Sequence, residues 1–259
     1  MDNGHPALAY TLTDRTGIVT GAASGIGRAT ALQLAGMGAS LCLVDLDSDG
    51  LAQTQKTIER QYGTPSMTVE TDAAEKAGID RVIAESISRL GAVDFLVNCA
   101  GILRRTAFTD MTIEEWDLVM RVNLRGPFLF CKAAAPERIR RGGGVIINVA
   151  SLAGRSSSIL GGAHYTVSKH GIIGLSRHLA RELGPLGIRV NAFCPGATLT
   201  PMTAKTAPPE EIQALAATMP RRKWATPEEQ AAVIGFLLTD AAVNITGACI
   251  DSNGGSLML

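Results

Sequence analysis

Apolar and polar positions follow two alternating patterns along most of this chain. Short apolar runs predict seven strands, at residues 17–20, 41–44, 67–70, 93–97, 144–149, 188–193 and 248–250. Amphipathic segments between them predict six helices, at residues 28–37, 51–62, 76–90, 112–135, 164–183 and 226–238. Most strands are apolar throughout, which is typical of a parallel sheet with helices on both faces. The pattern therefore predicts a doubly wound α/β fold around a seven-stranded parallel sheet.

Two stretches depart from this alternation. Residues 1–13 precede the first strand and predict a loose arm, whereas residues 14–259 predict a single domain without linkers or repeats. Inside that domain, residues 197–224 contain four prolines and show only weak periodicity. A long irregular insertion in a compact domain is often a mobile lid. We therefore expect residues 197–224 to cover the substrate, and we call them the cover segment.

The longest predicted helix, at residues 112–135, begins with the capping-box pattern that Thr112 and Glu115 form. It should bend at Gly126-Pro127, because proline cannot donate the next hydrogen bond of the helix. The following helix, at residues 164–183, ends at Gly184-Pro185.

Composition excludes several classes of partner. The chain has 259 residues, 46% of them hydrophobic, and a formal net charge of zero. No basic block is long enough to follow a nucleic-acid backbone, so we predict no nucleic-acid partner. No signal-peptide pattern and no apolar run of membrane-spanning length occurs, which predicts a cytoplasmic protein without a membrane partner. The five cysteines form no CxxC pair and the four histidines lack ligand spacing, so we predict no metal.

A glycine-rich loop joins the first strand to the first helix. Its glycines follow the spacing Gly21-x-x-x-Gly25-x-Gly27. Such a loop allows the backbone and the helix N-terminus to hold a pyrophosphate, although a tight turn that binds nothing has the same composition. The strand–loop–helix context favours binding and a Rossmann-type fold. The predicted contacts in the loop are Gly21, Ser24, Gly25, Ile26 and Gly27.

Acidic residues close the second and third strands. Asp45 lies about 20 residues beyond the middle glycine, where a carboxylate accepts from a ribose 2′-hydroxyl and repels a 2′-phosphate. Asp45 therefore predicts NAD(H), and Asp47 or Asp49 fits a capping role better. Asp72 either lies beside the adenine or caps a helix.

Tyr165 and Lys169 are four residues apart in a predicted helix, so their side chains share one face. A free phenol titrates near ~10, and a neighbouring cation lowers that value and makes the phenolate a usable base. Taken alone, such a pair is usually a solvated helix face. Its chemical meaning depends on the motifs that surround it.

The motifs, in order, resemble those of the short-chain dehydrogenase/reductase family. They are Thr20 with the glycine loop, Asn98-Cys99-Ala100-Gly101, Asn123, Ser151, Tyr165-x-x-x-Lys169 and Pro195-Gly196. The resemblance covers roughly residues 13–258, and several motifs in register are far more specific than any one of them.

The resemblance implies a role for each residue around the substrate. Ser151 would bond the substrate oxygen, and Tyr165 would exchange a proton with that oxygen. Lys169 would lower the pKa of Tyr165 and, like Tyr165, contact the nicotinamide ribose. Asn123 would anchor a water that links Lys169 to solvent. The hydride would pass directly between substrate and nicotinamide, without a metal.

The remaining implied cofactor contacts follow two strands, at residues 93–97 and 188–193. They are Asn98, Ala100, Gly101, Pro195, Gly196, Thr198 and Thr200. Thr198 stands where the family commonly has an aliphatic residue, and Cys99 where it has asparagine or alanine. The interval from Ser151 to Tyr165 is one residue longer than the commonest one, which leaves the serines at positions 156–158 as alternatives.

Two features bear on the substrate. Arg104-Arg105 follows the Asn98 motif, and a similar pair occurs in sugar-acid dehydrogenases of the family, where arginine suits carboxylate binding. The alternative is a solvent-facing pair. His164 either lines the pocket or is a surface residue at the start of its helix.

These observations predict an NAD(H)-dependent dehydrogenase of a secondary alcohol, with the ketone as reverse substrate, and a sugar acid or another hydroxy compound as the alcohol. One alternative is an NADPH-dependent 3-oxoacyl-thioester reductase. An alternative of another class is a non-catalytic dinucleotide-sensing protein. The family resemblance also implies a homotetramer, with helices 112–135 and 163–183 pairing across a dimer.

Overall fold

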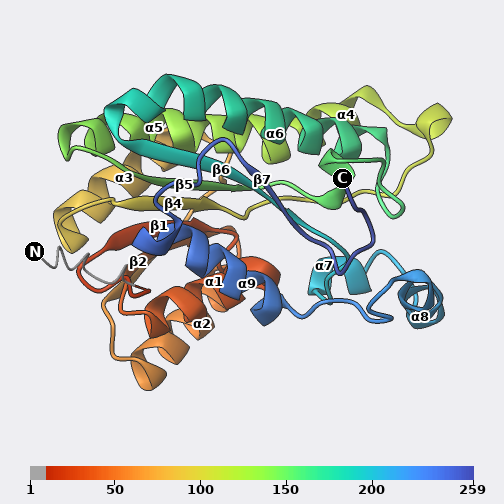
Figure 1. The fold of residues 1–259 in the computed structure, drawn as a ribbon, viewed down its shortest axis with the longest axis horizontal. Coiled ribbons are helices and arrows are strands. Elements are labelled where there is room, and N and C mark those ends of the chain that lie inside the picture. Colours follow the sequence, from red (N-terminus) through yellow and green to blue (C-terminus); the bar gives the residue numbers. More distant parts are fainter. Residues whose placement is uncertain (1–9) are drawn as a thin grey trace, which may run out of the picture.

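A seven-stranded parallel sheet runs through the middle of the computed structural model, which describes residues 10–259 (Figure 1). Its strands are β1 (Thr16–Thr20), β2 (Ser40–Asp45), β3 (Ser66–Glu70), β4 (Phe95–Asn98), β5 (Gly144–Val149), β6 (Ile188–Pro195) and β7 (Cys249–Ser252). Their spatial order is β3-β2-β1-β4-β5-β6-β7, and every neighbouring pair is parallel. This order confirms the predicted doubly wound sheet.

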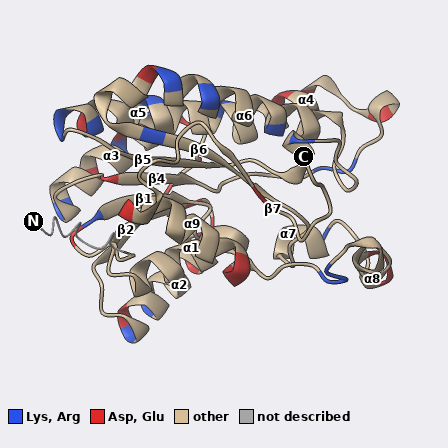
Figure 2. Cartoon of the chain, in the orientation of Figure 1, with Lys and Arg blue, Asp and Glu red and all other residues tan. Residues whose placement is uncertain are grey.

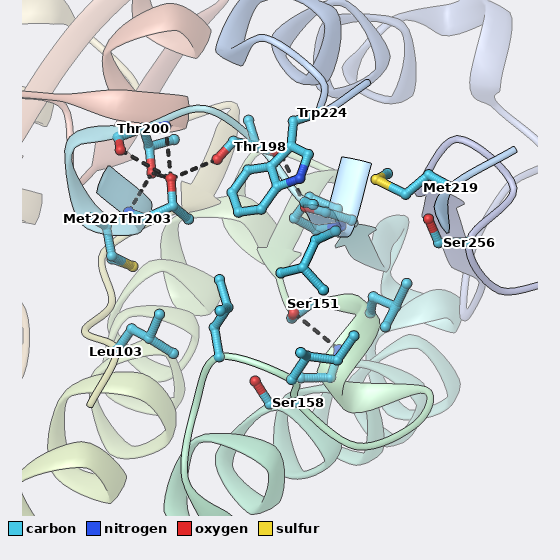
Figure 3. Close-up of a pocket in the computed structure, with 18 of the residues that line it drawn as sticks. Leu103, Ser151, Ser158, Thr198, Thr200, Met202, Thr203, Met219, Trp224 and Ser256 are labelled. Atoms are coloured by element: carbon cyan, nitrogen blue, oxygen red, sulfur yellow. Dashed lines mark hydrogen bonds between the residues drawn. The ribbon is translucent and has the colours of Figure 1, made fainter. Parts of the chain in front are cut away.

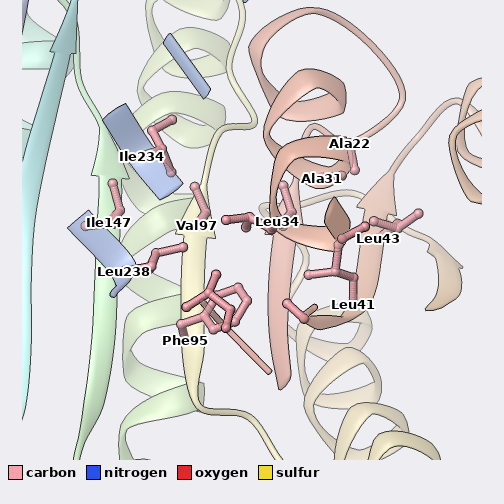
Figure 4. Close-up of a cluster of buried hydrophobic side chains, with 14 of the residues drawn as sticks. Ala22, Ala31, Leu34, Leu41, Leu43, Phe95, Val97, Ile147, Ile234 and Leu238 are labelled. Carbon is pink, nitrogen blue, oxygen red and sulfur yellow. The ribbon is translucent and has the colours of Figure 1, made fainter. Parts of the chain in front are cut away.

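Helices cover both faces of the sheet (Figure 1). One layer contains α1 (Gly25–Gly36), α2 (Ser48–Gln61) and α9 (Pro227–Leu238). The other layer contains α3 (Lys76–Leu90), α5 (Gly126–Arg140) and α6 (Ala163–Leu183). Successive strand residues alternate between two core clusters, as Val19 and Ile18 do, because a strand points consecutive side chains to opposite faces. Figure 4 shows the first cluster, where Leu34 and Ile234 reach Val97.

The order of the strands reverses between β1 and β4, and the end of β1 is tied to the end of β4 there. Thr20 Oγ1 accepts hydrogen bonds from the backbone N–H groups of Cys99 (3.1 Å) and Ala100 (3.0 Å). In open α/β sheets, ligands bind beyond the carboxyl ends of the strands at this reversal. The fold therefore places the glycine loop and the Asn98 motif at one edge.

The bend predicted in the long helix takes the form of a π-helical turn. Thr112 Oγ1 accepts from Glu115 N (3.1 Å) and caps α4 (Ile113–Met120). A π-helical turn at Arg121–Arg125 then precedes α5, which begins at the Gly126-Pro127 pair. Because proline has no N–H to continue the ladder, the spacing relaxes one turn before it. This turn carries Asn123.

The cover segment is more regular than its sequence predicts. It contains α7 (Pro201–Ala204) and α8 (Pro209–Thr218), so the expectation of an irregular segment is wrong. A reciprocal capping box between Thr200 and Thr203 begins α7, and Pro209 occupies the first turn of α8. Proline there costs nothing, because the first N–H groups of a helix have no intrahelical partner.

The predicted arm lies largely outside the described part of the chain, since residues 1–9 are not described. Its end is packed against the domain: Leu12 is buried, and its N–H donates to Met37 O (2.8 Å). Basic and acidic residues are interspersed over the helices rather than gathered by sign (Figure 2). Among residues 10–259, no helix has the length and apolarity needed to cross a bilayer, and no His, Cys, Asp and Glu cluster could hold a metal.

Candidate active site

Two adjoining cavities lie beyond the carboxyl ends of the strands. The glycine-loop cavity, of about 380 Å³, is lined by Gly21, Asp45 and Asp72 among others. The tyrosine cavity, of about 490 Å³, is lined by Tyr165 and Ser151 among others. Three residues line both cavities and mark where they meet: Ile26, Thr200 and Met202. The arrangement suits an elongated ligand in one cavity and a smaller one in the other.

The glycine loop has a backbone that other residues adopt only with strain. Gly21 and Gly25 have φ values of 70° and 53°, in the left-handed region that favours glycine. A Cβ on Gly27 would lie 2.0 Å from Gly21 O, so the loop and the first turn of α1 are in close contact. Helix α1 begins at Gly25, directly after the extended residue Ser24. Its first N–H groups therefore line the cavity and fit a pyrophosphate.

Asp45 is held at the end of β2 by the backbone around it. Its carboxylate accepts from the N–H groups of Ala23 (3.1 Å), Leu46 (2.7 Å) and Asp47 (3.2 Å). The capping role belongs to Asp47, which accepts from Gly50 N (2.9 Å) at the start of α2. Asp45 therefore lines the cavity as a fixed negative charge without capping a helix.

Asp72 does not cap a helix either, because the N-cap of α3 is Glu75. Its carboxylate accepts from Arg121 Nη1 (2.6 Å) and from Ala74 N (2.9 Å). Burial alone would raise the pKa of Asp72, but these bonds and the charge of Arg121 lower it below its usual value. The structure therefore contradicts the predicted alternative that Asp72 caps a helix, and Asp72 lines the glycine-loop cavity.

Lys169 and Asn123 join α6 to the end of β5 and to the π-helical turn. Lys169 Nζ donates to Val149 O at the end of β5 (2.9 Å). Asn123 is fully buried, and its amide bonds the backbone of Ile102 in both directions (2.8 and 2.9 Å). It also donates to Ser168 Oγ (3.3 Å). The π-helical turn is therefore fixed to the loop after β4 and to α6.

Tyr165 and Ser151 lie together on the wall of the tyrosine cavity. Burial raises the pKa of the Tyr165 phenol, and its hydrogen bond with Ser151 only partly opposes that rise. Burial also lowers the pKa of Lys169 to about 8, and its Nζ lies 5.7 Å from the centre of the phenol ring. Burial therefore dominates the pKa of the Tyr165 phenol, and the net lowering expected from Lys169 does not appear in this structure.

The extra residue between Ser151 and Tyr165 lies in a loop that leaves Ser151 in place. Ser151 follows β5 directly, and its Oγ accepts from Ala153 N (3.0 Å), which leaves the hydroxyl proton free to donate. Ser156 and Ser157 are exposed. Ser158 also lines the cavity, where its Oγ accepts from Gly161 N (2.7 Å) (Figure 3). The serine that shares a hydrogen bond with Tyr165 is Ser151.

His164 contradicts both of its predicted roles. The residue is 0% exposed, and it does not line either cavity. Its Nδ1 accepts from Tyr165 N (2.8 Å), so the proton belongs on Nε2, which lies 2.8 Å from Glu115 Oε1. The imidazole thus satisfies a backbone donor in the first turn of α6 and ties that turn to α4.

The arginine pair is divided between two environments. Arg104 is exposed, lines the glycine-loop cavity and donates to Leu103 O (3.2 Å). Arg105 forms two hydrogen bonds with the carboxylate of Glu211 on α8, both at 2.8 Å. Neither arginine lines the tyrosine cavity. The solvent-facing interpretation fits Arg104 in part, whereas Arg105 joins the loop after β4 to the cover segment.

The other predicted cofactor contacts divide between the cavities, except for Asn98 and Lys169, which line neither. Ala100 and Gly101 line the glycine-loop cavity, and Pro195, Gly196 and Thr198 line the tyrosine cavity. The Asn98 side chain is buried between strands, where Nδ2 donates to Asn148 Oδ1 (2.7 Å). In this structure, the side chain of Asn98 therefore supports the sheet.

Several lining residues carried no signal in the sequence. Arg121, which holds Asp72, lies in the π-helical turn two positions before Asn123. Leu103, Leu160 and Leu215 line the tyrosine cavity from three different segments. Nothing local distinguishes them from other apolar or basic residues, because only the tertiary fold brings their segments together. Met202, Met219 and Trp224 of the cover segment do line the cavity, as expected.

Comparisons with known proteins agree with this geometry. A family model described as enoyl-(acyl carrier protein) reductase matches residues 21–256. The (3R)-3-hydroxyacyl-CoA dehydrogenase of Rattus norvegicus is 38% identical over 265 aligned positions, which cover 97% of this chain and 100% of that protein. Levodione reductase from Leifsonia aquatica is 36% identical over 94% of each chain.

Solved structures show the same likeness. A crystal structure of levodione reductase matches with a TM-score of 0.89 at 34% identity, over 94% of this chain and 98% of that one. L-sorbose reductase from Gluconobacter frateurii, complexed with NADPH and L-sorbose, matches with a TM-score of 0.90 at 28% identity, over 96% and 99%.

Proposed function

The chain belongs to the short-chain dehydrogenase/reductase family, and from this premise we propose that it transfers a hydride between NAD(H) and a secondary alcohol or the corresponding ketone. One observation carries the proposal. Tyr165 and Ser151 share a cavity wall directly beside a glycine-loop cavity that fits a dinucleotide. A proton donor for the substrate oxygen thus adjoins the predicted cofactor site.

The residues present fit a nicotinamide dinucleotide that spans the two cavities. The first turn of α1 would hold the pyrophosphate, Asp45 the adenine ribose, and Lys169 the nicotinamide ribose. When bound, the cofactor supplies or accepts the hydride. The chain itself positions the substrate and moves one proton.

In ketone reduction, Tyr165 donates its phenolic proton to the carbonyl oxygen, and the Ser151 hydroxyl donates a hydrogen bond to the same oxygen. The raised pKa of Tyr165 keeps the phenol protonated at neutral pH, which suits the acid role. In alcohol oxidation, Tyr165 must first lose that proton, and the ammonium of Lys169 stabilises the phenolate. We also propose that Asn123 anchors the water through which Lys169 exchanges protons with solvent.

Asp45 supports NAD(H) over NADP(H). A fixed carboxylate at this position accepts from a ribose 2′-hydroxyl but repels a 2′-phosphate. Neither Ser24 nor Leu46 beside it offers a cation, and Arg121 is paired with Asp72. Fluorescence titration with both reduced cofactors tests this choice, and tighter binding of NADPH would overturn it.

A second candidate substrate is a 3-oxoacyl or 3-hydroxyacyl thioester. The similarity to a (3R)-3-hydroxyacyl-CoA dehydrogenase favours it. The thioester would still undergo reduction at a ketone, so Tyr165 and Ser151 would keep their roles. Acetoacetyl-CoA with NADH and with NADPH, assayed beside simple ketones, separates this candidate from the first.

We further propose a cytoplasmic homotetramer. All five cysteines are unpaired, which fits a reducing compartment. The outer surface of α5 and α6 carries partly exposed apolar side chains, including Phe128 and Leu175, that a dimer contact would cover. Phe130, Ile172 and Ile173 on the same two helices are buried in the core.

The decisive experiment compares the wild type with Tyr165→Phe. The variant lacks only the phenolic oxygen, so we expect about a 1,000-fold loss of kcat in NADH-dependent ketone reduction, because general acid catalysis supplies rate of this order. Binding of NADH should persist. A non-catalytic dinucleotide sensor would instead bind NADH in both forms and reduce no member of a broad ketone panel.

A further inference from the structure

We infer that the substrate is an uncharged, predominantly apolar ketone, with few hydroxyl groups and no carboxylate. This inference rests on the proposed function and narrows its substrate class. It is carried by the composition of the tyrosine cavity, by the hydrogen bonds of its hydroxyl groups, and by the positions of the nearest arginines.

Among residues 10–259, no charged side chain lines the tyrosine cavity. Apolar residues reach it from the loop after β4, from the loop after β5 and from the cover segment, for example Leu103, Leu160 and Met219. Figure 3 shows Trp224 and Met219 on the side of the cavity away from Ser158. Trp224 is only 4% exposed, so its indole ring is a fixed part of that wall. A carboxylate in this cavity would lose its hydration without gaining a partner.

Apart from the Trp224 indole, every polar side chain on the wall is a hydroxyl, and most of these are already bonded. Thr198 donates to Gly196 O (3.0 Å), and Thr203 donates to Thr198 O (2.8 Å). Thr218 donates to Leu215 O (2.8 Å). A polyol would therefore find few free donors for its hydroxyl groups, and each unpaired hydroxyl would weaken binding.

Two of the polar groups on the wall are those that the reaction needs. Ser151 Oγ accepts from Ala153 N, and the Tyr165 phenol lies beside it on the same wall. A single carbonyl oxygen satisfies both groups. Three further donors remain for other acceptors of the ligand: the Trp224 indole N–H, which is buried without a partner in the described part of the chain, and the hydroxyls of Ser158 and Ser256. The rest of the ligand meets mostly apolar surface. This is the usual design of a small-molecule site, in which a few polar groups fix orientation and apolar walls supply affinity.

The arginines that predict a carboxylate substrate lie elsewhere. Arg104 lines the glycine-loop cavity, and Arg105 forms a salt bridge with Glu211. Neither of the two basic residues that follow the Asn98 motif therefore lines the tyrosine cavity.

A pair of ketones of equal shape tests the inference. The enzyme is given 4-methylcyclohexanone and 4-oxocyclohexanecarboxylate with NADH, and kcat/KM is measured for each. We expect a preference of about 100-fold or more for the neutral ketone, because burying an unpaired carboxylate is costly. The same pair is titrated against the enzyme–NADH complex, where quenching of NADH fluorescence reports binding without turnover. A polyhydroxylated cyclohexanone serves as the third compound and should rank below the methyl ketone in both assays.

Two variants with one matched control sharpen the test. Leu215 on α8 lines the cavity, whereas its neighbour Ala214 is exposed and does not. Leu215→Arg should shift the ratio of kcat/KM values toward the carboxylate by about tenfold, because it adds the missing partner, and Ala214→Arg should leave the ratio unchanged. Met202→Arg, at a residue 38% exposed on the cavity rim, repeats the test if Leu215→Arg does not fold. Arg104→Ala should not change the ratio.

The outcomes separate this inference from the proposed function. Equal or better use of the carboxylate or of the polyol by the wild type, or a ratio that depends on Arg104, overturns the inference and leaves the reaction standing. Tighter binding of the methyl ketone without reduction of any compound supports the apolar cavity and overturns the proposed reaction.

Discussion

At the scale of single residues, Lys169 shows how burial governs the site. Its side chain is nearly inaccessible to solvent, and Nζ has one backbone acceptor, Val149 O, at 2.9 Å. Desolvation lowers its pKa from 10.5 to about 8. Lys169 is therefore still charged at neutral pH in the folded chain, and burying that charge lowers the free energy of unfolding.

That cost depends on pH with a definite sign. The unfolded chain binds the Lys169 proton more tightly than the folded chain, so stability from this residue rises with pH between about 8 and 10.5. Relative to a Lys169→Met variant, the wild type should gain about 2 kcal/mol of unfolding free energy between pH 7 and 9.5. Urea unfolding of both proteins at the two pH values measures it.

The difference between the two proteins is needed because four cysteines, whose pKa values burial raises to about 11 or 12, act in the opposite direction above pH 9. The effects of Cys42 and Cys131 cancel when wild type and Lys169→Met are compared at each pH, whereas Cys99 and Cys194 interact with Lys169 and remain part of the difference. A difference that stays constant, or falls, as the pH rises would show that Lys169 is not desolvated in the folded enzyme.

Asp45 is the residue on which cofactor choice depends. Asp45→Asn removes the charge and keeps one acceptor oxygen, which can serve the Leu46 and Asp47 N–H groups but not the Ala23 N–H, which donates to the other oxygen. We expect the ratio of the NADPH and NADH dissociation constants to fall by about tenfold, because the repulsion of a 2′-phosphate is lost. Fluorescence titration measures both constants. Asp49→Ser, which removes an exposed charge nearby on α2, is the matched control and should leave the ratio unchanged.

Single residues were predictable where local chemistry fixes them. The glycine loop and Asp45 lie as expected, because positive φ values and a strand end are local properties. His164 was not predictable, since its partner Glu115 is 49 positions away in the sequence. The direction of the Tyr165 pKa was not predictable either, because the burial that raises it is a tertiary property.

At the scale of elements, the cover segment is fastened to the loop after β4. The guanidinium of Arg105 forms an ion pair with the carboxylate of Glu211. Glu211 raises the pKa of Arg105 and Arg105 lowers the pKa of Glu211, so each group favours the charged form of the other. The bond joins one rim of the tyrosine cavity to α8. It is positioned to hold the cover segment over a bound substrate.

Loosening that bond should weaken substrate binding more than catalysis. Glu211→Gln should raise KM for the ketone by about threefold and leave kcat nearly unchanged, because an exposed ion pair contributes little free energy. Steady-state kinetics of Glu210→Gln gives the control, since its side chain is exposed and forms no salt bridge with residues 10–259. If both variants behave alike, α8 does not depend on Arg105 for its position.

The elements themselves were largely predictable, and the exceptions have physical causes. Long amphipathic helices and apolar strands follow from periodicity. The helices of the cover segment were missed because α7 has a single turn and α8 packs few apolar residues against the domain. The Pro208-Pro209-Glu210-Glu211 run was an available signal, because proline and acidic residues favour a first helical turn.

At the scale of the whole molecule, one helical layer retains a surface that the fold does not cover. Phe128 on α5 is 43% exposed, beside a shallow cavity that Leu124 and Leu175 also line. Lys132 Nζ lies 6.0 Å from the centre of the Phe128 ring. Apolar side chains on an outer helix are typical of contacts between subunits. We propose, from the family resemblance, that this surface is a dimer contact.

Phe128→Glu should therefore shift the protein from a tetramer to smaller species, because a carboxylate from each subunit would be buried at the contact. Light scattering coupled to size-exclusion chromatography measures the mass. Tyr62→Glu is the matched control: Tyr62 is 42% exposed and follows α2 on the opposite helical layer. A monomeric wild type, or a tetramer that survives Phe128→Glu, would show that the apolar surface of α5 does not hold subunits together. Loss of assembly in both variants would instead indicate a general effect of added charge.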